Sequence, residues 1–177
     1  MKNNIYDLRL RTTIASSILL VLLMGSCSEQ ETQKLGYVDN MKLFTSFQMQ
    51  EDLFKQLEVL TNKRKTALDS LKVKIEAKKR VLKEKQEVTQ EEYEAFETLK
   101  QEYYSKESRY SEEIGKIEEK YNQQIWDKLN SLTRGYGEDN EYDFIYGANG
   151  SGSLMYSKED FDVTDKLIEY CNAQYQK

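Results

Sequence analysis

The chain has no histidine and no proline, and it carries only two cysteines among 177 residues. Without histidine, Ser-His-Asp and Cys-His catalytic arrangements and histidine metal sites are excluded. The two cysteines, Cys27 and Cys171, lie far apart in the sequence and form no thiolate cluster. The glycines of Asn149-Gly150-Ser151-Gly152 lack the Gly-x-x-x-x-Gly-Lys pattern of a phosphate loop. We therefore expect no enzyme, no cofactor and no metal site.

A long apolar run is also missing, apart from a short one near the N-terminus. Residues 14–24 form an apolar run about eleven residues long, whereas a helix needs roughly 20 residues to cross a bilayer. Lys2, Arg9 and Arg11 precede the run, and small residues follow it. This order is typical of a signal peptide, which we place at residues 1–26.

The end of this segment, Leu23-Met24-Gly25-Ser26-Cys27, resembles a bacterial lipoprotein signal. The resemblance implies that Cys27 is acylated, becomes the new N-terminus and attaches the chain to a membrane through its lipid. Ser28 at the next position is associated with delivery to the outer membrane, and residues 27–33 then form a polar tether. Two alternatives stay open: an ordinary secretory signal with a chance cysteine, and a disulfide between Cys27 and Cys171, which would contradict lipidation. With lipid on Cys27, Cys171 would be a free buried thiol.

Residues 50–132 contain a single glycine and are rich in Lys, Glu, Gln, Leu and Ala, which favour helix. Thr89 and Glu92 have the spacing of a capping box, and Val88 and Tyr93 have that of a hydrophobic staple. We therefore expect one helix to end near residue 86 and a second to start at Thr89. The short connection between them predicts an antiparallel hairpin.

Apolar residues at three- and four-residue spacing predict a single seam along this hairpin. The numbers of facing residues sum to 174 or 175, as for Leu71 with Tyr103 and Leu57 with Ile117. Arg64 should interrupt the seam opposite Tyr110. Residues 62–85 carry a net charge of +7 and residues 87–119 one of −7, so the flanks of the two helices should attract one another.

The segments on either side of the hairpin predict a small body with β-strands. We expect a strand at 34–39, a helical turn at 40–47, a break of the second long helix at 136–140 and a β-hairpin from strands 142–146 and 153–156. Thr164 or Asp162 should cap a final helix that contains Cys171. The fold class is thus mainly α with a small β body, in one domain of residues 34–177. The body comprises 34–49 and 133–177, and the coiled-coil arm comprises 50–132.

In this order of elements the chain resembles the Skp/OmpH family of periplasmic chaperones, as a lipoprotein variant. The resemblance rests on the long charged hairpin and on motifs at either side of it: Leu35-Gly36-Tyr37-Val38-Asp39, Tyr142-Asp143-Phe144-Ile145, Gly150 to Tyr156 and Asp162 to Ile168. It implies a homotrimer in which three helical arms descend around a cavity. It also implies an ATP-independent holdase that binds unfolded outer-membrane β-barrel proteins in the periplasm, here anchored to the outer membrane by lipid. The alternative is a structural coiled-coil envelope lipoprotein, a spacer or adaptor for a folded partner, which the acidic net charge of −5 and the anchor favour.

Four aromatic residues on the second arm helix are candidates for client contact: Tyr93, Phe96, Tyr103 and Tyr104. For the tyrosines on the seam, packing is the first interpretation, because a buried ring can leave its hydroxyl in water. Tyr104 lies off the seam and is free for contact. The basic runs 63–65 and 78–80 could suggest nucleic acid, but in an exported chain with an acidic partner helix we expect helix pairing and no nucleic acid.

Overall fold

The computed structural model describes residues 32–150, 152 and 154–176. The chain divides into two compact units, Met1–Gln33 and Lys34–Lys177, and the second contains every helix and strand of the described residues. The predicted signal peptide and Cys27 lie outside the described residues, as does most of the tether.

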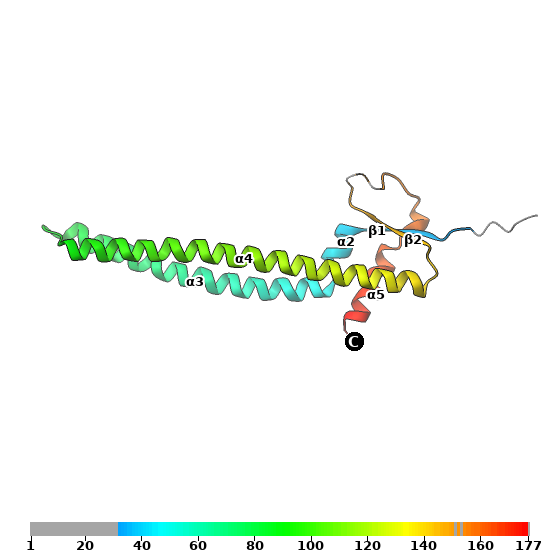
Figure 1. Cartoon of the computed structure of the whole chain (residues 1–177), viewed down its shortest axis with the longest axis horizontal. Coiled ribbons are helices and arrows are strands. Elements are labelled where there is room, and N and C mark those ends of the chain that lie inside the picture. Colours follow the sequence, from blue (N-terminus) through cyan, green and yellow to red (C-terminus); the bar gives the residue numbers. More distant parts are fainter. Residues whose placement is uncertain (1–31, 151, 153, 177) are drawn as a thin grey trace, which may run out of the picture. The chain divides into compact units, whose positions relative to one another are not determined.

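Two long helices dominate the second unit and lie side by side (Figure 1). Helix α3 spans Gln48–Glu84 and helix α4 spans Gln90–Asp139. Thr89 caps α4: its hydroxyl accepts a hydrogen bond from the Glu92 amide at 3.2 Å, while its own amide donates to the Glu92 carboxylate at 3.3 Å. The predicted capping box and antiparallel hairpin are therefore confirmed.

The predicted seam is present, and Arg64 interrupts it opposite Tyr110 as expected, with Glu113 as a further partner. The Arg64 guanidinium lies 4.6 Å from the ring centroid of Tyr110 and donates to the Glu113 carboxylate at 2.8 Å. The apolar residues that follow three- and four-residue spacing on the first arm helix are shielded at least in part: Leu53, Leu57, Leu60, Ala67, Leu71, Ile75 and Leu82. Tyr93 is the exception on the returning helix, since 52% of it is exposed.

Helix α4 ends at Asp139, inside the segment 136–140 where a break was predicted, and its end is a Schellman motif. The amide of Tyr142 donates to the carbonyl of Gly137 at 2.9 Å, and the amide of Glu141 donates to the carbonyl of Glu138 at 3.3 Å. Glu141 takes the left-handed conformation, with φ of 57°. Tyr136 is buried and stacks on Tyr142, so packing outweighs the low helix propensity of the nearby glycines.

The body contains a parallel sheet of two strands, β1 (Leu35–Asp39) and β2 (Phe144–Ala148). The predicted β-hairpin is wrong: residues 154–158 form no strand, and β2 pairs with β1 instead. Pairing with β1 sets buried Val38 and the partly buried Ile145 against the same core, whereas the side chains of Met155 and Tyr156 are exposed and offer no buried face.

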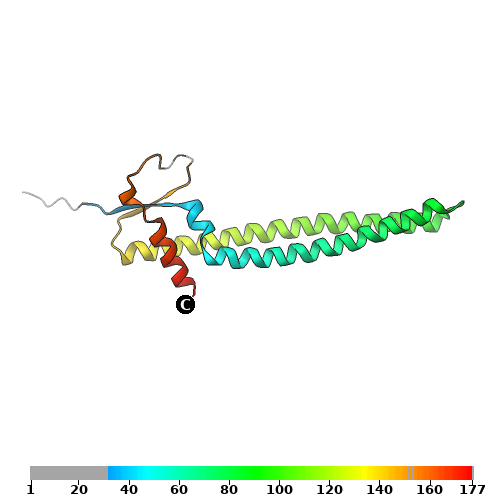
Figure 2. The same cartoon turned by 180° about the vertical axis from the view of Figure 1, so that it is seen from behind.

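Three short helical elements complete the body: α2 (Asn40–Thr45), the 3₁₀ helix η1 (Glu159–Phe161) and α5 (Thr164–Tyr175). Asp162, one of the two predicted caps, accepts from the Thr164 amide at 2.8 Å. The Thr164 hydroxyl instead accepts from the Asp39 amide at 3.0 Å, which ties the end of β1 to the start of α5. Figure 2 shows α5 against the C-terminal part of α4, from behind.

Sequence-distant segments meet in a single apolar core beneath the sheet. Cys171 is a free thiol with no exposed surface, as predicted for the final helix. The core comprises Val38, Leu43, Phe47, Ile125, Leu129, Tyr136, Val163, Leu167 and Cys171.

Candidate binding groove between the two long helices

A groove opens between α3 and α4 in the part of the hairpin far from the body. It encloses about 530 Å³. Ile75 of α3 and Lys100 of α4, whose residue numbers sum to 175 as in the seam register, both line it. Because a lysine bends outward toward water, such a layer closes less completely than one between two leucines. The groove is lined by Lys72, Ile75, Glu76 and Lys79 of α3 and by Phe96, Lys100, Tyr103, Tyr104 and Glu107 of α4.

Aromatic side chains form the α4 wall of the groove. The rings of Tyr103 and Tyr104 meet edge to face, with centroids 5.5 Å apart. Tyr104 is 60% exposed, while Phe96 and Tyr103 are half-buried. The rings of this wall are already accessible, so a ligand can contact their faces and edges while the packed core stays folded.

Charged groups form the rim. Lys100 pairs with Glu97 at 3.0 Å, and this hydrogen bond is the main reason that the pKa of Lys100 is raised. The Lys100 ammonium also lies 5.4 Å from the centroid of Phe96. The hydroxyl of Tyr103 donates to Glu107 at 3.0 Å, and that bond, followed by burial, raises the pKa of Tyr103.

Lys72 differs from its neighbours on the rim. Within the described part of the chain it forms no ion pair, whereas Lys79 approaches Glu76 at 4.0 Å. The groove therefore combines apolar walls with an ammonium group that has no carboxylate partner among these residues.

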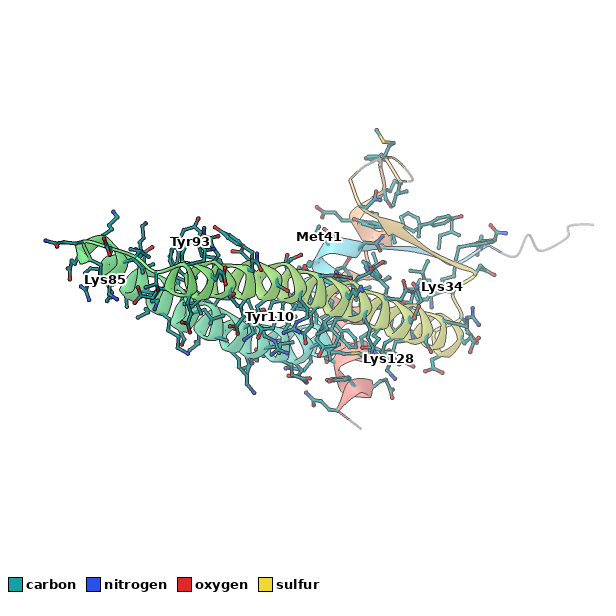
Figure 3. All side chains as sticks on the ribbon, turned by 60° about the vertical axis from the view of Figure 1, so that its left-hand side comes forward. Lys34, Met41, Lys85, Tyr93, Tyr110 and Lys128 are labelled. Atoms are coloured by element: carbon teal, nitrogen blue, oxygen red, sulfur yellow. The ribbon has the colours of Figure 1, made fainter. Side chains whose placement is uncertain are left out.

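Three of the four predicted contact residues, Phe96, Tyr103 and Tyr104, come together in this groove. Tyr93 does not line it and lies nearer the end of the hairpin, close to the level of Lys85 (Figure 3). Sequence reasoning did not place Lys72 and Lys79 at the same site. Their signal was available, because Lys65, Lys72 and Lys79 recur at seven-residue spacing and so share one face of α3.

The body presents a second uncovered surface. The rings of Phe144 and Tyr146 stack on one exposed side of β2, with centroids 6.0 Å apart. Among the described residues the sheet has only the two strands, so the outer edge of β2 keeps unpaired backbone groups. Other large apolar side chains exposed on the body are Met41, Met155, Tyr156 and Phe161.

The described residues hold no cluster of three or more His, Cys, Asp or Glu side chains that could bind a metal ion. None of the helices in this part of the chain is both long and apolar enough to span a bilayer.

The fold is thus a small mixed body that carries one long helical hairpin with an aromatic groove. The chain belongs to the OmpH-like outer membrane protein family, whose model matches residues 34–170. The predicted family and fold class are thus confirmed.

A solved structure has the same fold. It is described as an OmpH-like outer membrane chaperone from Caulobacter crescentus CB15 and superposes with a TM-score of 0.62 at 12% sequence identity. The similarity covers 81% of this chain and 86% of that one. No curated protein matches the chain.

Proposed function

We propose that this protein is an ATP-independent holdase chaperone of the periplasm that binds unfolded outer-membrane β-barrel proteins. Membership of the OmpH-like family supports a periplasmic chaperone role in general. The observation that carries the finer proposal is the groove between α3 and α4, which exposes aromatic and aliphatic surface along a hairpin.

The groove suits an unfolded β-barrel chain for a physical reason. Such a chain carries apolar side chains at alternate positions, and these are exposed to water until the barrel closes. A shallow aromatic surface with a charged rim can make many weak contacts with different sequences and can release them without an energy source. Phe96, Tyr103 and Tyr104 are the client contacts in this proposal, with Tyr93 as a further contact nearer the end of the hairpin.

We also propose that the chain works as a homotrimer held together at its bodies. A sheet of two strands is only marginally stable alone, and an open strand edge can pair with another chain. The exposed rings of Phe144 and Tyr146 beside that edge provide apolar surface for the same contact.

The final part of the proposal is a lipid on Cys27, which anchors the chaperone to the outer membrane from the periplasmic side. The support is the sequence Leu23-Met24-Gly25-Ser26-Cys27 with Ser28 after it. Mass spectrometry of the chain purified from membranes tests this part: a diacylglyceryl group on Cys27 is expected, and an unmodified or disulfide-bonded Cys27 would exclude it.

A dilution assay tests the chaperone function. The chain from Ser28 onward contains the whole compact unit and is mixed with a urea-unfolded β-barrel protein before dilution. Suppressed turbidity, with three chains per client by light scattering, is the expected result. Unchanged aggregation with a monomer or dimer would instead favour the adaptor.

Matched variants locate the binding surface. Tyr104→Ser removes an exposed groove ring and should raise the amount of chaperone needed by about twofold, because single contacts of this kind contribute weakly. Val59→Ser, at an exposed α3 position outside the groove and nearer the body, is the control and should leave the assay unchanged. Complete loss of binding from one such substitution would point to an adaptor with a defined partner.

A further inference from the structure

Most of the basic charge on the first arm helix is not neutralised by the second. Residues 62–85 carry a net charge of +7 and residues 87–119 one of −7. Among the described residues only two ion pairs join these segments, Arg64 with Glu113 and Lys85 with Glu92. The predicted attraction between the flanks is therefore met in part, and much of the basic charge stays available at the surface of α3.

Two hollows meet on the surface of α3. The candidate groove opens toward α4, and a shallow depression of about 550 Å³ lies beside it. We call this second hollow the α3 depression, and it is lined by Lys72, Val73, Glu76, Ala77 and Arg80. Because Lys72 and Glu76 line both hollows, they form a ridge between them. The groove and the α3 depression are therefore neighbouring parts of one surface.

The two hollows lie on different sides of α3. Ile75 lines the groove, while Val73 and Ala77 line the α3 depression. A helix turns by about 100° per residue, so a position two residues away points about 200° away. Val73 is 68% exposed, which leaves its apolar surface open to a ligand. A ligand that contacts both hollows must cross α3, whose width with side chains is about 10–12 Å.

The basic groups around the two hollows are only partly neutralised. Among the described residues, neither Lys72 nor Arg80 takes part in an ion pair. The carboxylates that line the hollows already have partners. Glu76 approaches Lys79 at 4.0 Å, and Glu107 accepts from the Tyr103 hydroxyl at 3.0 Å. A ligand carboxylate would therefore find an ammonium group on the ridge that no carboxylate of the described fold occupies.

An extended client segment fits this arrangement. Side chains of a β-strand alternate between two faces, so its residues i, i+2 and i+4 share one face. At about 3.3 Å per residue, residues i and i+4 are about 13 Å apart, which is enough to reach from the groove across the helix to the α3 depression. Residue i+2 then lies over the ridge, beside Lys72.

We propose that the α3 depression is a second part of the client site, and that the combined surface selects extended segments with apolar side chains at i and i+4 and a carboxylate at i+2. Charge complementarity gives the middle position, because Lys72 on the ridge and Arg80 beyond it are both unpaired cations. A carboxylate at i+1 would point away from α3 and gain little. Lys72 is thus the specificity-determining residue. The inference rests on the proposed holdase function and names the client segment that its groove takes.

Three end-labelled peptides test the position of the carboxylate. Phe-Thr-Glu-Thr-Leu places Glu at i+2, Phe-Glu-Thr-Thr-Leu places it at i+1, and Phe-Thr-Gln-Thr-Leu removes its charge. The first two have the same composition and the same net charge. Fluorescence anisotropy with the chain starting at Ser28 should give the first peptide a Kd about threefold lower than either of the others, since one exposed ion pair contributes weakly.

Substitution of Lys72 tests its role on the ridge. Lys72→Gln should bring the Kd values of the three peptides together. Lys63→Gln is the matched control, because it removes the same charge from an exposed α3 position outside both hollows, and it should keep the preference. Raising salt from about 0.1 M to about 1 M shortens the screening length from about 10 Å to about 3 Å and should weaken the preference in the parent.

Substitution of Val73 tests the α3 depression. Val73→Ser should raise the Kd of Phe-Thr-Glu-Thr-Leu about twofold, because less apolar surface is then buried. It should leave unchanged the Kd of Phe-Thr-Glu-Thr-Thr, which has no apolar residue at i+4. Val59→Ser, at an equally exposed α3 position outside both hollows, is the control and should affect neither peptide.

Equal Kd values for the two Glu isomers, or no binding of any peptide, would overturn the inference. Equal effects of Val73→Ser and Val59→Ser would overturn the crossing of α3. In each case the proposed function stands if the same protein suppresses aggregation of a urea-unfolded β-barrel protein. A preference that depends on Lys72, in a chain that does not suppress aggregation, would instead overturn the holdase function and keep the segment-binding site.

Discussion

The body and the hairpin use the same kinds of apolar residue but bury them to different extents. In the body, Ile125, Leu129 and Leu167 have at most 1% of their surface exposed. In the hairpin, the best-covered residues, Leu57 and Leu71, keep 8% and 7%, and most other seam positions are half-buried. The body core is enclosed by several elements, while each seam residue has a single partner helix to cover it.

The comparison shows where the protein can deform. Opening a two-helix seam exposes little new surface at each layer, so the hairpin can bend at low cost, whereas the body must unfold cooperatively. The layer at Arg64 adds to this difference, because the Nε atom of Arg64 is buried without a hydrogen-bond partner. A rigid body with compliant arms suits a surface that accepts clients of different shape.

The largest expected difference between the body and the hairpin is in the cost of truncating one leucine in each. Leu129→Ala should lower the free energy of unfolding by about 4 kcal/mol, because an enclosed core leaves a cavity. Leu71→Ala should cost about 2 kcal/mol, since the open seam can collapse around the gap. Urea denaturation at one protein concentration measures both. Equal losses would mean that the seam is as well enclosed as the body.

The hairpin was largely predictable from sequence because its information is local. Helix propensity, the Thr89 and Glu92 spacing and the seven-residue pattern together set the two helices, their turn and their register. The exposure of Tyr93 was not predictable, because at the end of the hairpin no further turn of α3 is available to cover a large ring.

The body was less predictable because its contacts join distant residues. Strand β2 could pair with a near segment or with β1, more than 100 residues earlier, and only the shared core decides. The end of α4 was predictable only to within a few residues, because the left-handed cap is Glu141 and not one of the glycines. In the groove, the aromatic residues were found from sequence, but Lys72 and Lys79 needed the pairing of the helices.

Alkaline pH should destabilise the body through Cys171. Burial raises the pKa of this thiol from its ordinary value of 9.0 to about 11. Between these values the unfolded chain loses the proton and the folded chain keeps it, so stability is fully present below pH 9 and falls as the pH rises toward 11. We expect a loss of about 1 kcal/mol per pH unit in this window, close to the limit for one group.

Comparison with Cys171→Ala isolates this effect from the titration of tyrosines and lysines. The free energy of unfolding of the variant is measured from pH 8 to pH 11 and should fall less steeply than that of the parent by about the same amount. Parallel slopes for the two proteins would show that the thiol does not remain protonated in the folded body.

In the hairpin the expected effect is local: Thr89→Ala should loosen the start of α4. It removes the oxygen that accepts from the Glu92 amide, at a cost of about 1 kcal/mol to the first turn. Amide hydrogen exchange of Glu92 should become about fivefold faster, with little change in the body. The control is Thr98→Ala, whose hydroxyl bonds only the carbonyl of Glu94 within α4, and it should leave exchange unaffected.

At the C-terminal end of α4, a substitution to glycine should raise the free energy of unfolding. Glu141 has a φ of 57°, a conformation that costs a residue with a Cβ about 1 kcal/mol and that glycine adopts freely. Glu141→Gly should therefore raise the free energy of unfolding by about 0.5 kcal/mol after the greater freedom of glycine in the unfolded chain is subtracted. Glu138→Gly, three residues earlier and inside α4, is the matched control and should lower it by about 1 kcal/mol. If both substitutions were destabilising by the same amount, the end of α4 would be held by the Glu141 side chain and not by its backbone conformation.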